Sequence, residues 1–186
     1  MAEKKKRLER QDWINAGFRA LTVKGPEGLR VEPIARELRS TKGSFYWHFN
    51  DLNDLHYSML EYWQSAATEQ IIARLQALPR GLPRLLALVQ AVNMPHEAQG
   101  GAGAEAAVRA WGQSYVPARD AMRAVDQRRL AFLSECFADM GLTDPELPRL
   151  LYAAHLGLEQ LSMHADVDPA RTLAHLVSLL AEESSA

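Results

Sequence analysis

The sequence predicts an all-α protein in which a small N-terminal domain of three helices precedes a larger helical bundle. Apolar residues recur at intervals of three and four along nearly every segment, and no segment alternates as a strand would. Glycine and proline divide the chain into about nine such segments. The short segments gather in the first 50 residues. This pattern predicts one domain over 1–50 and another over 51–186.

The first 50 residues hold three expected helices. Apolar side chains share one face of a helix over 8–23, which Gly25-Pro26-Glu27-Gly28 ends. Two shorter helices follow over 31–38 and 41–49, with a tight turn between them. This arrangement is typical of a helix-turn-helix.

The rest of the chain predicts longer helices. Asn50 or Asp51 caps the first of them, and Thr143-Asp144-Pro145-Glu146 forms a capping box at the start of the next-to-last. A loop rich in Gly and Ala is expected over 95–103. Long amphipathic helices of this kind pack as a bundle. The helices are expected over 51–78, 82–93, 104–111, 117–140, 146–164 and 169–181.

Charge is unevenly distributed, although the formal net charge of the chain is only -2. Residues 1–50 carry 11 Lys and Arg against 6 Asp and Glu, whereas residues 51–186 carry 10 against 17. A basic module ahead of an acidic one suits a nucleic-acid reader joined to a domain with another task. Residues 1–7 are expected to form a flexible basic arm.

Several classes of protein are excluded by what the sequence lacks. No apolar run approaches the roughly 20 residues that span a bilayer, and none follows the basic N-terminus as in a signal peptide. The single Cys136 excludes an internal disulfide and a multi-cysteine metal site. We therefore expect a cytoplasmic protein with no membrane segment. Without a phosphate-binding glycine loop, a nucleophile-base spacing or clustered ligands, we expect no enzyme, cofactor or metal.

The segment Thr41–Phe49 contains the most specific pattern. Its first turn, Thr41-Lys42-Gly43-Ser44, is slim and polar, as entry into a major groove about 12 Å wide requires. Thr41 is expected to cap the helix, where free amides favour a phosphate.

The second turn of this segment is bulky. Phe45 and Phe49 are four residues apart and should face inward, which leaves Tyr46, Trp47 and His48 outward at the height of the phosphates. The alternative is that all five rings form an ordinary aromatic core. Five consecutive rings cannot all be buried on one helical turn, so some must face solvent or a partner.

With Ile34-Ala35-Arg36-Glu37-Leu38 and the helix over 8–23 before it, Thr41–Phe49 resembles the N-terminal domain of the TetR/AcrR family of bacterial transcription regulators. The resemblance covers residues 8–60. It implies a helix-turn-helix DNA-binding domain, then a helical domain that binds a ligand and dimerises.

The resemblance also implies roles for individual residues. Lys42, Gly43 and Ser44 would touch bases and nearby phosphates, while Tyr46 and His48 would hold the DNA backbone. Arg30 stands where the family often has a threonine, and it could reach a phosphate but could not cap a helix. The expected DNA-binding residues are Arg30, Thr41, Lys42, Gly43, Ser44, Tyr46, Trp47 and His48.

Other positions depart from the family pattern. Arg39 stands in the turn where a glycine is usual, and a left-handed backbone there would cost on the order of 1 kcal/mol. Ser40 replaces an apolar residue, and Leu52 replaces a lysine that touches phosphate. These departures concern the strength of DNA contact rather than the fold.

The second domain is expected to hold a cavity for an unidentified small molecule. The candidate lining residues are large, soft or polar groups on apolar helix faces, and ordinary core or interface packing is the alternative for each. They are Trp63, Met94, Trp111, Tyr115, Phe132, Cys136, Tyr152, His155 and Glu159, with Met163 beside them.

The last two helices, about 146–181, contain more leucine than one face of each could bury within a monomer. By the resemblance, they pair with their copies in a four-helix homodimer interface, where Gly157 would permit close approach. A two-fold dimer reads a palindromic operator of double-stranded DNA.

The leading hypothesis is therefore a homodimeric repressor that a small molecule releases from its operator. One alternative is an activator on the same fold. Another is a helical small-molecule-binding protein with weak or lost DNA binding, which the departures at Arg39, Ser40 and Leu52 favour.

Overall fold

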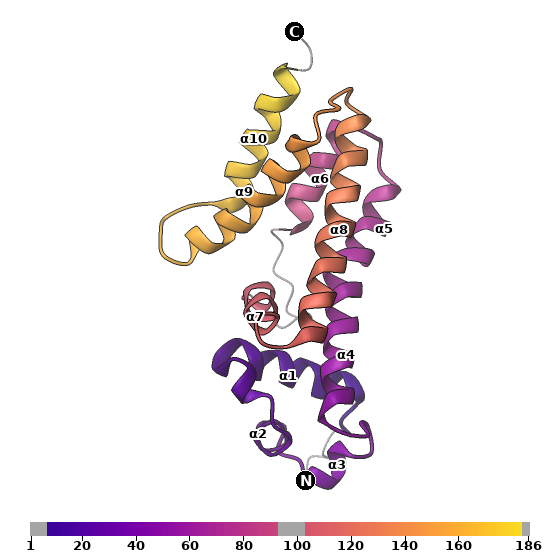
Figure 1. Cartoon of the computed structure of the whole chain (residues 1–186), viewed down its shortest axis with the longest axis vertical. Coiled ribbons are helices and arrows are strands. Elements are labelled where there is room, and N and C mark those ends of the chain that lie inside the picture. The colour runs from indigo at the N-terminus through magenta and orange to yellow at the C-terminus, as the bar shows by residue number, and fades with distance from the viewer. Residues whose placement is uncertain (1–6, 93–102, 184–186) are drawn as a thin grey trace, which may run out of the picture. The chain divides into compact units, whose positions relative to one another are not determined.

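The computed structural model describes residues 7–92 and 103–183, which form helices joined by short turns (Figure 1). No strand occurs within these two ranges, and the all-α class is confirmed. Nor does any helix within them combine the length and the hydropathy needed to cross a membrane. The expected basic arm up to Lys6, most of the loop over 95–103, and Met94 lie outside the described residues.

The first helices form near the expected positions. Helix α1 is Arg10–Lys24, the 3-10 turn η1 is Pro26–Gly28 and α2 is Val31–Glu37. A capping box starts α1, in which the backbone N–H of Glu9 donates to Asp12 Oδ2 at 2.7 Å. Gly25, with φ of 66°, ends it, as the Gly-Pro pair predicts. The third helix, α3, is Lys42–Phe45, shorter than the expected 41–49.

The expected helix over 51–78 contains a wider turn. Asp51 caps helix α4, Leu52–Gln64, and its carboxylate accepts from the N–H of Asp54 at 2.9 Å. A π-helical turn, Ser65–Glu69, then leads into α5, Gln70–Gln76. Such turns form where a side chain satisfies the displaced backbone groups. Here the guanidinium of Arg129 donates to the Ala67 carbonyl at 3.2 Å and to Thr68 Oγ1 at 3.1 Å.

The later helices agree with expectation to within a few residues. The prediction of a capping box at Thr143–Glu146 is wrong, because Pro145 occupies the N-cap position and its side chain has no hydroxyl that could accept a hydrogen bond. Instead the Asp144 carboxylate accepts from the N–H of Glu146 at 2.9 Å. The helices are α6 Leu82–Val92, α7 Ala104–Trp111, α8 Val116–Ala138, α9 Glu146–Ser162 and α10 Pro169–Glu183.

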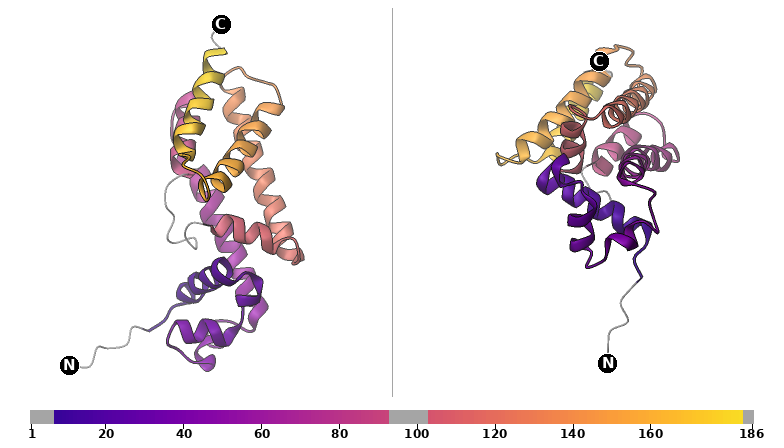
Figure 2. Two further views of the ribbon diagram at one scale, coloured as in Figure 1. Left: turned by 90° about the vertical axis from the view of Figure 1, so that its left-hand side faces the viewer. Right: turned by 60° about the horizontal axis from the view of Figure 1, so that its bottom comes forward.

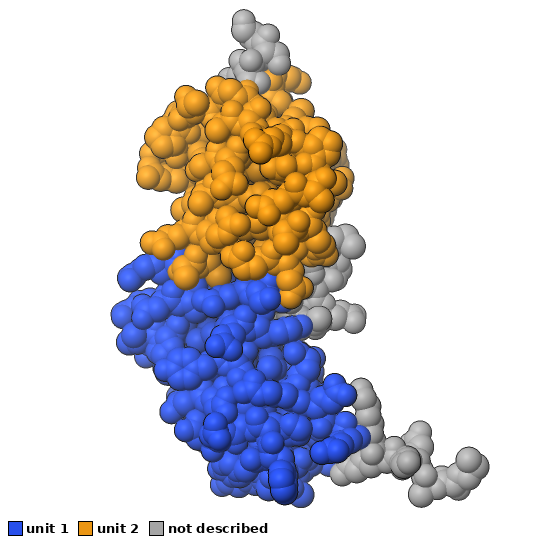
Figure 3. Space-filling view, turned by 90° about the vertical axis from the view of Figure 1, so that its right-hand side faces the viewer, with its two compact units in different colours: residues 1–66, 95–123 blue, residues 67–94, 124–186 orange. Residues whose placement is uncertain are grey.

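The chain divides into two compact units, residues 1–66 with 95–123 and residues 67–94 with 124–186 (Figure 3). A compact unit is defined by packing and a domain by function, so the expected boundary after residue 50 stays a prediction.

The core of the first unit is aromatic. Trp13, Phe18, Phe45 and Phe49 are all buried, and the ring of Trp13 meets that of Phe45 edge-on at 5.5 Å. Helices α1 and α4 pack closely at Gly17, where an added Cβ would lie 2.6 Å from the sulfur of Met59. This core holds the short helix α3 on the rest of the unit.

The core of the second unit joins α5, α6, α8, α9 and α10. Leu85, Phe132, Cys136, Phe137 and Val177 are buried at its centre. Figure 2 shows α9 and α10, in orange and yellow, side by side, and the two helices are in contact.

Candidate nucleic-acid interface

The segment Thr41–Phe49 is fixed at both ends by its own side chains. Thr41 is the N-cap of α3, and its hydroxyl accepts from the N–H of Ser44 at 3.1 Å, as expected. Beyond Phe45 the backbone continues in hydrogen-bonded turns, and the N–H of Phe49 donates to the Phe45 carbonyl at 3.0 Å. The rings of Phe45 and Phe49 stack at 5.1 Å and are buried, which confirms that they face inward.

The opposite side of this segment is open. Thr41, Lys42 and Gly43 are exposed, and Ser44 is half-buried. A Cβ added at Gly43 would meet only the Thr41 hydroxyl, at an ordinary 3.7 Å. No packing inside the protein therefore requires a glycine there. Its benefit is a flat surface, which a groove-reading helix needs.

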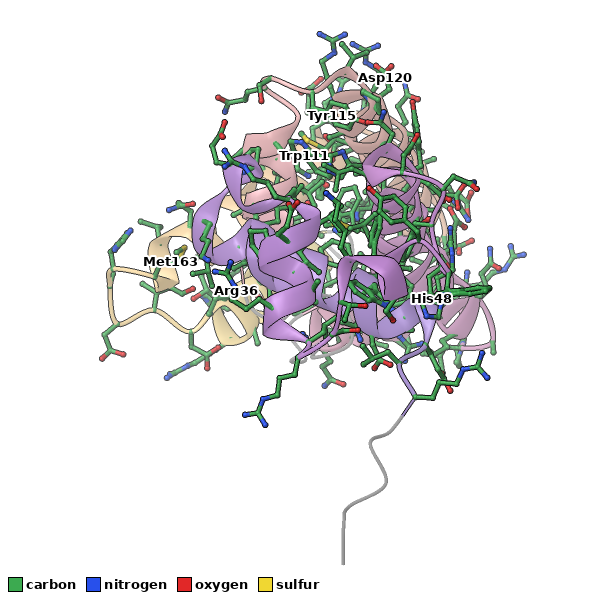
Figure 4. All side chains as sticks on the ribbon, turned by 90° about the horizontal axis from the view of Figure 1, so that it is seen from below. Arg36, His48, Trp111, Tyr115, Asp120 and Met163 are labelled. Atoms are coloured by element: carbon green, nitrogen blue, oxygen red, sulfur yellow. The ribbon has the colours of Figure 1, made fainter. Side chains whose placement is uncertain are left out.

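Aromatic side chains border this open edge. Trp47 is 89% exposed and Tyr46 is 51% exposed, as their expected outward direction requires. His48 is half-buried, and its ring tilts toward Trp13 at 6.3 Å (Figure 4 shows the first unit from this side). Trp47 is therefore the more exposed of the two rings beside the first turn of α3.

The turn before α3 is tight. Arg39 has φ of 49°, a left-handed conformation. Glycine, the usual residue of the resembled family at this position, adopts that conformation more easily. The N–H of Ser40 reaches back to the Ala35 carbonyl at 2.8 Å, which holds the turn in place. The arginine therefore keeps the turn geometry at a cost on the order of 1 kcal/mol.

The two cations among the expected DNA-binding residues, Arg30 and Lys42, are paired with carboxylates. Arg30 is the N-cap of α2 without a side-chain cap, as expected, and it lies 3.1 Å from Glu27. The ammonium of Lys42 lies 2.8 Å from Glu32. The hydrogen bond to Glu32 raises the pKa of Lys42, and the same bond lowers the pKa of Glu32. Both groups are therefore charged at neutral pH, and sequence reasoning missed this pairing.

The start of α4 is arranged around Asp54 rather than a lysine. Asp54 accepts from the Arg10 guanidinium at 2.6 Å, and Arg10 also lies 4.5 Å from the ring centre of Phe49. Leu52, where the resemblance implies a lysine, is half-buried. A leucine side chain cannot make the phosphate contact that the resemblance implies for a lysine at position 52.

Trp63, one of the candidate ligand residues of the first unit, is buried. Two others, Trp111 and Tyr115, belong to an aromatic cluster in which their rings stack at 4.9 Å (Figure 4). His56 completes the cluster, with its ring 5.0 Å from Trp111 and 5.5 Å from Tyr115. Both of its ring nitrogens are buried without a hydrogen-bond partner in the described residues, and burial lowers its pKa.

Sequence reasoning missed His56, although the pattern could have identified it. The residue lies four after Leu52 and three before Met59, on the apolar face of its helix. A histidine on such a face usually has hydrogen-bond partners for its ring nitrogens, and His56 has none among the described residues.

The candidate residues of the second unit lie in and beside its core. Phe132 and Cys136 are buried, and burial raises the pKa of the Cys136 thiol to about 11, which keeps it protonated. The hydroxyl of Tyr152 donates to Asp126 Oδ1 at 2.7 Å and accepts from Arg129 at 3.0 Å. His155 and Glu159 lie 3.9 Å apart, and Met163 is exposed.

An open apolar groove runs between α9 and α10. Leu161 and Leu179 are exposed there, and an added Cβ at Gly157 would meet nothing within 4 Å. The groove is lined by Ala154, Gly157, Leu158, Leu161, Thr172, His175, Leu176 and Leu179.

The chain is similar to solved transcription regulators. Escherichia coli NemR in its reduced form is 20% identical, with a TM-score of 0.71, and the match covers 90% of this chain and 94% of that one. A regulator from Rhodococcus described as TetR-family is 20% identical, with a TM-score of 0.68, over 92% and 96%. A regulator from Saccharomonospora viridis, solved with choline, is 17% identical, with a TM-score of 0.68, over 93% and 95%. No protein-family model and no curated sequence matches the chain.

Proposed function

We propose that this chain, which has the fold of the TetR/AcrR transcription regulators, reads double-stranded DNA as a homodimer and represses transcription until a small molecule releases it. One observation supports DNA reading above the rest. Helix α3 presents a capped, slim first turn, Thr41–Ser44, on a rigid aromatic base, with Trp47 exposed beside it. A helix-turn-helix needs this surface for the major groove.

The expected contacts follow from this surface. Lys42 and Ser44 would contact base edges, while Thr41 and Tyr46 would contact phosphates. Arg30 would reach a phosphate with the guanidinium donors that Glu27 does not hold. The ring of His48 is half-buried. His48 would therefore contribute through its main-chain atoms and its packing inside the protein more than through a side-chain contact with a phosphate.

Charge reversal at Lys42 tests the assignment. In a gel-shift assay on a DNA fragment that the wild-type protein selects, Lys42→Glu should lower affinity at least 100-fold, because the new carboxylate faces bases and phosphates. Lys24→Glu, an exposed change at the end of α1, provides a matched control. Equal binding by Lys42→Glu and Lys24→Glu would refute the assignment.

The groove between α9 and α10 supports the homodimer. Its apolar lining and the open face of Gly157 suit a second copy of the same two helices, which would bury the exposed leucines. Two reading heads related by a two-fold axis would match a palindromic operator.

A releasing ligand would bind to aromatic and polar side chains of the helices. The aromatic cluster of His56, Trp111 and Tyr115 and the polar network of Tyr152 offer groups that a small molecule could contact. One neighbour of the same fold was solved with choline. A ligand would act by binding more tightly to the form that does not fit DNA.

A further inference from the structure

The only cation in the first turn of α3 is partly neutralised before any DNA arrives. Lys42 Nζ lies 2.8 Å from Glu32 Oε1, which is in the first turn of the neighbouring helix α2. Both side chains are more than half exposed, at 53% and 61%. The pair therefore lies on the surface that the proposed function turns toward DNA.

An exposed pair of this kind adds little to stability and does not lock Lys42 in one conformation. It does change which acceptor the ammonium prefers. A phosphate oxygen that approached Lys42 would bring its negative charge close to the carboxylate of Glu32. The guanine acceptors O6 and N7 are neutral and meet no such repulsion. Because an ammonium has three donors, two remain for a base while Glu32 holds the third.

The position of Glu32 strengthens this effect. In a helix-turn-helix the first helix crosses the DNA backbone while the second enters the groove. Glu32 is on that first helix, α2, close to its N-cap Arg30. Its carboxylate therefore faces the path of the phosphates even when Lys42 has moved away.

We propose that Glu32 is a specificity-determining residue that directs Lys42 toward neutral base acceptors and away from phosphates. This inference rests on the proposed function. Phosphate contacts carry almost all of non-specific DNA binding. Glu32 therefore weakens binding to unrelated DNA more than binding to the preferred site.

The test compares Glu32→Gln with Glu37→Gln. Glu37 is on the same helix and pairs with Arg19 at 2.6 Å, so its change removes an equal charge from a different ion pair. Fluorescence anisotropy would measure the Kd of each variant for the site that the wild type selects and for a shuffled duplex, between 50 and 200 mM salt. Circular dichroism would check that both variants fold.

For the shuffled duplex, Glu32→Gln should bind about fivefold more tightly and steepen the slope of log K against log salt by about 0.9. The gain on the selected site should be smaller, so that the ratio between the two duplexes falls. In a Lys42→Gln background the same change should lower that ratio by less than it does in the wild type, because the part of the effect that operates through Lys42 is lost.

Three results would overturn the proposal. If Glu32→Gln and Glu37→Gln changed the two Kd values equally, the effect would come from the loss of one negative charge and not from the position of Glu32. Weaker binding of the selected site alone would make Glu32 a direct reader or a support for Lys42. A wild-type protein that binds neither duplex would refute the proposed function, and the proposal with it.

Discussion

Single residues explain why the edge of α3 is both rigid and open. Thr41 caps the helix and the buried pair Phe45 and Phe49 anchors it, and the sequence predicted all three from spacing alone. The pairing of Lys42 with Glu32 could not be predicted in this way. Ten residues separate the two partners, and a turn with Arg39 in the left-handed conformation brings them together. Local periodicity contains no information about such a contact.

His56 gives a residue-scale prediction for pH. Its pKa is lowered by burial, with a smaller opposing influence from Asp51, so the unfolded chain binds a proton more readily than the folded one. Its contribution to stability is present above its unfolded pKa of about 6.5 and is lost as the pH falls through the lower folded value.

We therefore expect the free energy of urea unfolding to fall from pH 7 to pH 5 less steeply in His56→Phe than in the wild type. The difference should be at most about 1.4 kcal/mol per pH unit, the limit for one proton. His164→Gln, at an exposed position, is the control for the removal of a histidine. An unchanged slope in His56→Phe would show that His56 is not the responsible group.

Helices α4 and α5 show where prediction fails for a whole element. The apolar pattern predicted one helix over 51–78, but Ser65–Glu69 forms a π-helical turn between α4 and α5. Its support is Arg129, about 60 residues later, and Arg129 is held in turn by Tyr152. Tyr152 was a ligand candidate because it is a large polar group on an apolar helix face, and its hydrogen bonds to distant residues could not be predicted from the sequence.

Removal of the Tyr152 hydroxyl tests this network. Tyr152→Phe takes away a bond to Asp126 and one from Arg129, so the unfolding free energy should fall by about 1–3 kcal/mol. Tyr57→Phe removes an exposed hydroxyl and should change it by less than about 0.5 kcal/mol. Equal effects in chemical denaturation would mean that the network does not stabilise the turn.

At the scale of the whole molecule, composition alone predicted a basic head over residues 1–50 and an acidic body over 51–186. Four cations of the head, Arg10, Arg19, Arg30 and Lys42, each pair with a carboxylate. The leucines that exceed the needs of the core emerge in the groove between α9 and α10. The sequence could locate this surplus but could not show the groove, because the crossing of two helices depends on contacts throughout the unit.

The groove gives a prediction about assembly. Leu161→Glu places a charge in the groove and should convert the proposed dimer to a monomer in analytical ultracentrifugation. The affinity between the two copies should fall at least 100-fold. Leu150→Glu changes an equally exposed leucine of α9 that does not line the groove, and it should remain dimeric. If both variants stay dimeric, the interface lies elsewhere.

Selection of bound duplexes from a random pool by the folded wild-type protein tests the central claim most directly. We predict enrichment of a palindromic site with two half-sites one helical turn apart, or a multiple of a turn, and a stoichiometry of two chains for each site. If the pool showed no enrichment even at low salt while the protein remained folded, the claim that Thr41–Ser44 reads DNA would be contradicted.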